Sequence, residues 1–64
     1  MTIEQAQLAD QFQALLDMAR QAERLYAELA GGVGDAQLRD QLEQLSRDKQ
    51  RHAKLAERLL EIVQ

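Results

Sequence analysis

The 64-residue sequence contains no cysteine and no proline, and aromatic residues make up only 3% of it. Without cysteine there is no disulfide or thiolate metal site, although chains this short usually need a crosslink, a metal or an oligomeric partner to stay folded. Without proline, and with Ala, Leu, Gln, Glu and Arg as the main residues, the composition is that of long helices rather than of sheets. We therefore predict an all-α fold.

The charge balance and the hydropathy pattern argue against two classes of partner. A net charge of −3 and a pI near 4.9 provide no positive field for nucleic acid or for an anionic membrane. No apolar run approaches the roughly 18 residues that a membrane span needs, and the start lacks a basic segment followed by an apolar one. We expect a soluble, cytoplasmic protein that binds neither nucleic acid nor membranes.

Two long amphipathic helices are predicted, from about residue 3 to 30 and from about 36 to 63. Thr2 and Gln5 form a capping-box pattern at the start of the first helix. Residues 31–35, Gly-Gly-Val-Gly-Asp, interrupt the pattern, because glycine adopts the left-handed conformation that ends helices and Asp35 can cap the next one. A connection this short places the helices side by side and antiparallel within a single domain.

Apolar residues recur at alternating steps of four and three along both helices, which indicates one continuous buried face on each. One hairpin cannot cover both faces, so we predict a homodimer that closes a four-helix bundle through an isologous interface. The residues predicted to form it are Leu8, Phe12, Leu15, Ala19, Ala22, Tyr26, Leu29, Leu38, Leu42, Leu45, Lys49, His52, Ala56, Leu59 and Val63.

Lys49 and His52 are polar residues on the otherwise apolar stripe of the second helix. One interpretation is that they specify the register or orientation of the helices, with the lysine extending to the edge of the bundle. The other is that His52 binds a metal, assisted by Asp48 one turn earlier or by Glu23 from the facing helix, although a lysine is a poor neighbour for a cation. We predict no resident metal or cofactor, and these three residues are the candidates if a metal binds.

The remaining polar residues predict solvated faces rather than catalysis. The first helix is mainly acidic, whereas the second carries a basic stripe formed by Arg47, Arg51, Lys54 and Arg58. Opposite charges across a bundle edge favour one orientation of the helices, although each exposed pair contributes only about 0–1 kcal/mol. Ser46 lacks a neighbouring base, Tyr26 is a core position, and the glycines follow no strand. We therefore predict no catalytic site among these residues.

Two segments of the sequence carry a family resemblance. Residues 16–30, LDMARQAERLYAELA, resemble the first helix of a rubrerythrin or ferritin-like hairpin. Residues 35–42 and 49–53 are similar to the second helix of that family, which carries Glu-x-x-His-Ala. The resemblance covers most of the chain and implies a ferritin-like bundle of two hairpins.

In that family, each hairpin supplies a glutamate before the tyrosine and a Glu-x-x-His to a di-iron site. The matching positions here are Ala19, Lys49 and His52, so only the histidine is a ligand-type residue. The resemblance implies the fold and the bundle, whereas these departures argue against the family's di-iron chemistry. Our main hypothesis is therefore a non-enzymatic structural or interaction protein that has lost the metal site. Two alternatives stay open: a metal-binding or oxidoreductase relative with a rearranged site around His52, and an adaptor whose apolar face captures a helix of another protein.

Overall fold

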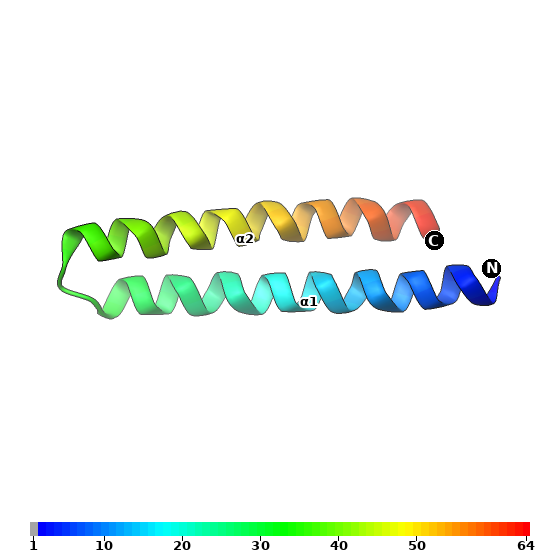
Figure 1. Ribbon diagram of the computed structural model, residues 1–64, viewed down its shortest axis with the longest axis horizontal. Coiled ribbons are helices and arrows are strands. Elements are labelled where there is room, and N and C mark those ends of the chain that lie inside the picture. Colours follow the sequence, from blue (N-terminus) through cyan, green and yellow to red (C-terminus); the bar gives the residue numbers. More distant parts are fainter. Residues whose placement is uncertain (1) are drawn as a thin grey trace.

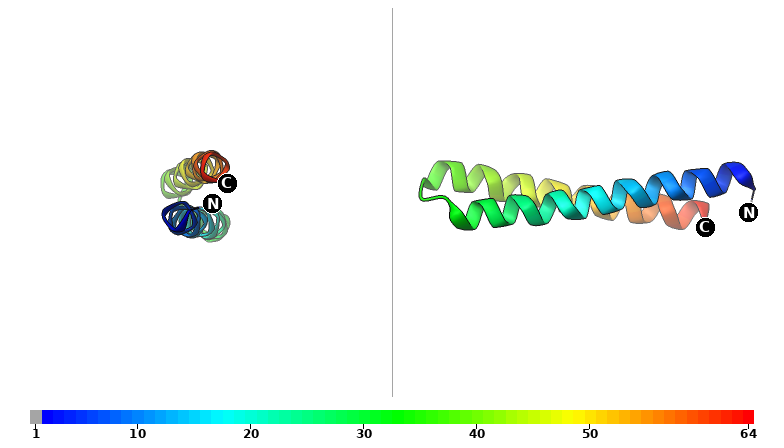
Figure 2. Two further views of the ribbon diagram at one scale, coloured as in Figure 1. Left: turned by 90° about the vertical axis from the view of Figure 1, so that its right-hand side faces the viewer. Right: turned by 90° about the horizontal axis from the view of Figure 1, so that it is seen from below.

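The computed structural model describes residues 2–64 and contains two helices, α1 (Ile3–Gly32) and α2 (Ala36–Val63), joined by residues 33–35. The helices lie side by side and antiparallel in a rod with extents of 50 × 13 × 10 Å (Figure 1). Seen along and across the rod, they form a single layer and cross at a shallow angle (Figure 2). The predicted all-helical hairpin is confirmed.

Each helix begins at the cap residue that the sequence indicates. Thr2 Oγ1 accepts a hydrogen bond from the backbone N–H of Gln5 at 3.1 Å, and Gln5 Oε1 accepts one from the N–H of Thr2 at 2.9 Å. Asp35 Oδ1 accepts a hydrogen bond from the N–H of Leu38 at 2.8 Å. These bonds satisfy N–H groups that the first turn of a helix leaves without a partner, so they define where both helices start.

The end of α1 differs from the prediction. The helix continues through Gly31 and Gly32, and no glycine or other residue between positions 2 and 64 has a positive φ. The helix stops because the backbone of Val33 is extended, with φ −98° and ψ 140°. The predicted left-handed glycine cap is therefore wrong, and the turn is made by extended residues instead.

The helices contact each other along a line of side chains, which we call the inner seam, and the buried members of this line are mostly small. Its central cluster consists of Leu16, Ala53 and Ala56, with Ala19 and Leu60 packed against it. The buried residues of the described chain are Ala9, Leu16, Ala30, Ala53 and Ala56. Because four of these five are alanine, the helices lie close together but remove little apolar area from water. The inner seam by itself therefore stabilises the hairpin only weakly.

Two polar contacts between the helices fix their register. The hydroxyl of Ser46 donates a hydrogen bond of 3.0 Å to the backbone carbonyl of Glu23 at a partly buried position. Arg20 forms an ion pair with Glu57 at the edge of the seam, where the two side chains remain 50% and 44% exposed. The solvent-screened ion pair contributes about 0–1 kcal/mol. Sequence reasoning did not predict this contact of Ser46, because Ala53, seven residues further along the same side of α2, gave no signal that this side is buried.

Candidate interaction face

The stripe predicted from the sequence divides between two surfaces in the single chain. One part lies in the inner seam, buried or partly buried, and comprises Phe12, Ala19, Tyr26, Leu42, Lys49, Ala56 and Val63. Ala22 is partly buried beside the seam, and the other members are exposed: Leu8, Leu15, Leu29, Leu38, Leu45, His52 and Leu59. The hairpin thus does not contain one continuous buried face. Whether the exposed part forms an interface with a second copy stays a prediction.

The exposed part belongs to a larger apolar surface, which we call the outer face. Its ten large side chains recur every seven residues in rows along both helices, so each row follows one side of its helix. They are between 39% and 78% exposed, and they are Leu8, Leu15, Met18, Leu25, Leu29, Leu38, Leu45, Leu55, Leu59 and Ile62. Contiguous apolar surface of this kind is typical of protein interaction sites.

The two helices enclose a groove of about 490 Å³ in the outer face. Both helices contribute to its lining, which consists of Leu15, Met18, Ala19, Ala22, Lys49, His52, Leu55, Ala56 and Leu59. Seven of these nine residues are apolar, and the two polar ones are the residues that the sequence singled out. Lys49 is partly buried, whereas His52 is exposed on the outer face. A groove with this lining can receive apolar side chains from a packed helix.

The three candidate metal ligands occupy different environments. His52 lines the groove, whereas Glu23 is partly buried and its backbone carbonyl accepts the hydrogen bond from Ser46. Asp48 already accepts hydrogen bonds from its own helix. Within residues 2–64, no three His, Asp or Glu side chains come together in an arrangement that could hold a metal ion.

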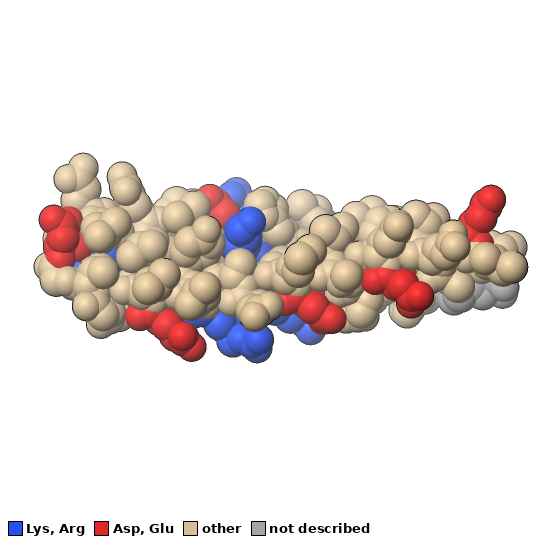
Figure 3. Space-filling view, turned by 60° about the horizontal axis from the view of Figure 1, so that its bottom comes forward, with Lys and Arg blue, Asp and Glu red and all other residues tan. Residues whose placement is uncertain are grey.

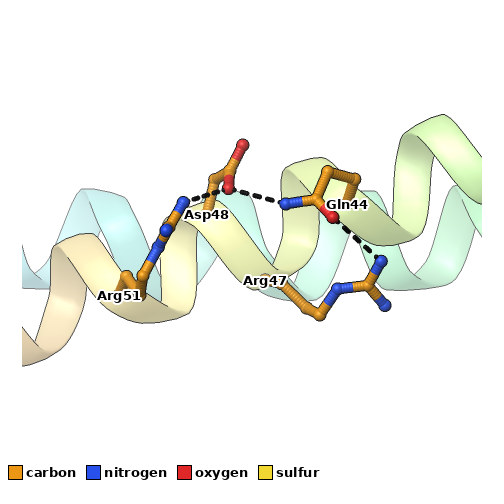
Figure 4. Close-up of polar contacts among 4 residues, drawn as sticks. All are labelled: Gln44, Arg47, Asp48 and Arg51. Atoms are coloured by element: carbon orange, nitrogen blue, oxygen red, sulfur yellow. Dashed lines mark hydrogen bonds and ion pairs between the residues drawn. The ribbon is translucent and has the colours of Figure 1, made fainter.

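Asp48 belongs to a short chain of polar contacts along α2 (Figure 4). Its Oδ1 atom accepts a hydrogen bond of 3.0 Å from Gln44 and also pairs with Arg51, while Arg47 donates a hydrogen bond of 3.1 Å to Gln44. Two members of the predicted basic stripe therefore have partners on their own helix. The space-filling view shows acidic and basic groups spaced along the rod with uncharged surface between them (Figure 3). The face in this view carries no broad patch of a single charge.

No protein-family model, no curated protein and no solved structure matches this chain. The resemblance to rubrerythrin and ferritin-like hairpins therefore stays a prediction. Over residues 2–64, neither helix has a stretch that is both long enough and apolar enough to cross a bilayer.

Proposed function

We propose that this chain is a structural module whose outer face packs against a second copy of itself to form a four-helix bundle. The proposal rests on one observation, the exposure of ten large apolar side chains along one side of a hairpin that buries five residues, four of them alanine. A helix of a stable monomer buries its large apolar side chains rather than leaving them in water. A second hairpin would cover both helices of the outer face at once.

The surface area supports a second copy as the occupant. The chain exposes 4886 Å², whereas a compact monomer of 7.3 kDa exposes about 4,200 Å². The excess of about 700 Å² reflects the elongated shape of the hairpin, and a second copy packed against the outer face would remove surface of this order from water. An isologous dimer is also the commonest assembly of identical chains, because one self-complementary face is enough to form it. A single foreign helix would leave part of a two-helix face uncovered.

The family resemblance supports the same assembly, since ferritin-like bundles are made from two hairpins. At the positions matching the family's ligands, Ala19 and Lys49 lie partly buried along the inner seam and His52 lies on the outer face. These residues supply packing and a few polar groups to the bundle, which is the role of a structural relative rather than of a di-iron protein.

Light scattering coupled to size exclusion, over a concentration series, tests the proposal. We expect a mass of twice 7.3 kDa. Small-angle scattering should show a particle that is thicker than the 50 × 13 × 10 Å hairpin, because the copies lie side by side. A folded monomer at micromolar concentration would overturn the proposal and would leave the outer face free for a helix of another protein.

A further inference from the structure

We infer, on the basis of the proposed self-association, that the two copies lie antiparallel, with their turns at opposite ends. In this arrangement α2 packs against α2 of the partner, and Asp48 and His52 of each copy meet His52 and Asp48 of the other. The pairing would assign a function to the two polar residues in the middle of the outer face of α2.

The pattern on α2 supports antiparallel self-pairing. Its outer side has two rows at seven-residue spacing: Leu38, Leu45, His52 and Leu59 in one, and Gln41, Asp48, Leu55 and Ile62 in the other. Two antiparallel copies of such a helix bring the first row of one against the second row of the other. The rows of the two copies overlap most when the two-fold axis of the dimer passes at the level of Gln50, because Gln50 lies midway between Leu38 and Ile62, the ends of the rows.

At this register, three of the four kinds of contact match in character, and in the fourth Gln41 lies at the end of the row opposite the partner's Leu59. Leu45 lies opposite the partner's Leu55, Leu38 lies opposite the partner's Ile62, and Asp48 lies opposite the partner's His52. The imidazole N–H can then donate a hydrogen bond to the carboxylate, and two-fold symmetry makes the contact twice. Hydrogen bonds to a charged group are stronger than neutral ones. The only ionisable groups within the α2 rows are therefore matched to each other.

α1 fits the same axis. Ser46 contacts Glu23 and Glu57 contacts Arg20 across the seam, so Gln50, which lies between Ser46 and Glu57, is level with the part of α1 around Ala22. An axis just beyond Ala22 brings this small residue opposite the partner's Leu25, and it brings Met18 opposite the partner's Leu29. The small Ala22 side chain leaves room for the larger Leu25 of the partner, as close packing requires.

The other arrangements place the Asp48 carboxylate against an apolar side chain of the partner. If the turns lay at the same end, α2 would face α1 of the partner, and Asp48 would lie against Leu25. If the antiparallel pair slipped by one seven-residue step, Asp48 would face the partner's Leu59 or, with the opposite slip, the partner's Leu45. Covering a carboxylate with an apolar side chain removes water without replacing its hydrogen bonds, which is costly. Arg51 and Gln44 already contact Asp48, and Lys49 lies on the same helix, but none of them provides a partner for His52.

Disulfide crosslinking tests the orientation, because the natural chain has no cysteine. Leu45→Cys and Leu55→Cys chains refolded together should form a crosslinked dimer, since the two positions lie opposite each other. Each variant refolded alone should not, because its two cysteines would be separated by about 15 Å along the helices, beyond the Cα distance that a disulfide spans. Gly34→Cys, in the turn, should stay uncrosslinked. Crosslinking of Gly34→Cys in a protein with dimer mass would overturn the orientation but not the self-association, whereas monomer mass for the natural chain would overturn both.

A residue swap tests the polar pair. His52→Asp should raise the dimer dissociation constant at least about tenfold, because two carboxylates then face each other across the axis. Adding Asp48→His to this variant restores the reciprocal pair with its members exchanged, so the dissociation constant should return to within about threefold of the natural value. An exchange variant as weak as His52→Asp would overturn the Asp48–His52 contact.

Discussion

The inner seam and the outer face run along the same two helices, but they are built from different side chains. The inner seam buries one large residue, Leu16, and leaves its other large side chains partly exposed, whereas the outer face carries ten exposed leucine, isoleucine and methionine side chains. Dispersion and hydrophobic burial both scale with side-chain size. The apolar groups that could contribute most to stability therefore lie where the single chain leaves them exposed, which indicates that the hairpin depends on a second interface.

A charge placed on the outer face should have the largest effect. Leu55→Asp puts a carboxylate in the proposed interface, and an unpaired buried charge costs several kcal/mol, so we expect the dimer dissociation constant to rise at least about 100-fold. The free chain should tolerate the change, because Arg51 and Arg58 lie one turn away on the same helix and favour an acidic residue. Light scattering should give the monomer mass of 7.3 kDa.

The matched control for this experiment is Gln50→Asp on the same helix. Gln50 is exposed outside the outer-face rows, and Arg47 and Lys54 lie within one turn of it. The same carboxylate should therefore leave the mass and the dissociation constant unchanged. If both aspartates dissociated the dimer equally, the outer face would not be the interface.

Truncation within the inner seam should have the next largest effect. Leu16 is 4% exposed and packs on Ala53 and Ala56, and truncation of a buried leucine to alanine costs about 2–4 kcal/mol. We expect this loss for Leu16→Ala in urea denaturation at fixed protein concentration. Ile3→Ala serves as the comparison, because Ile3 is 80% exposed and lies outside both surfaces; its change should stay within about 0.5 kcal/mol. A loss below about 1 kcal/mol for Leu16→Ala would mean that the inner seam is not a packed contact.

The local features of the fold could be predicted from the sequence, because short-range chemistry determines them. The caps at Thr2 and Asp35 depend on residues within one turn, and the apolar spacing indicated both helices. The division into two surfaces could not be predicted in the same way. Apolar residues of the inner seam and of the outer face both recur at steps of three and four along each helix. The spacing in the sequence therefore cannot separate the two surfaces, and it predicts a single stripe.

Two residue types account for the other differences. Alanine is equally common on exposed and buried helix positions, so Ala9, Ala30 and Ala53 gave no signal that they form the inner seam. Glycine fits both the helical and the left-handed conformation, so the sequence did not show that Gly31 and Gly32 continue α1. For the candidate site, the polarity of Lys49 and His52 indicated two unusual positions, but only the packing separates the partly buried lysine from the exposed histidine.

A smaller effect is expected from the hydrogen bond that crosses the inner seam. Ser46→Ala removes the donor to the carbonyl of Glu23 at a partly buried position, and such a bond contributes about 1 kcal/mol. Gln44→Ala removes side-chain hydrogen bonds that stay within α2, so it should change stability by less than about 0.5 kcal/mol. The difference in stability between the two variants is measured by their denaturant midpoints, provided that the free energy of unfolding depends on denaturant concentration with the same slope in both. Equal midpoints would show that the Ser46 contact does not help to hold the helices together.

The smallest effects are expected at the end of α1, where the structure and the sequence pattern disagree. Gly31 is helical, and a Cβ atom added there would meet nothing within 4 Å. Replacing a helical glycine by alanine stabilises a protein by about 0.5–1 kcal/mol, since alanine has less backbone freedom to lose on folding. We expect Gly31→Ala to raise the thermal midpoint accordingly, measured by circular dichroism.

A synthetic chain with D-alanine at position 31 provides the mirror-image control, because D-residues favour the positive φ that L-residues avoid. Since no residue from 2 to 64 has a positive φ, the D-alanine chain should melt below the natural one while the L-alanine chain melts above it. Both chains add the same methyl group, so the difference between them reports backbone conformation alone. The reverse order of midpoints would mean that α1 ends in a left-handed glycine cap in solution, as the sequence pattern indicates.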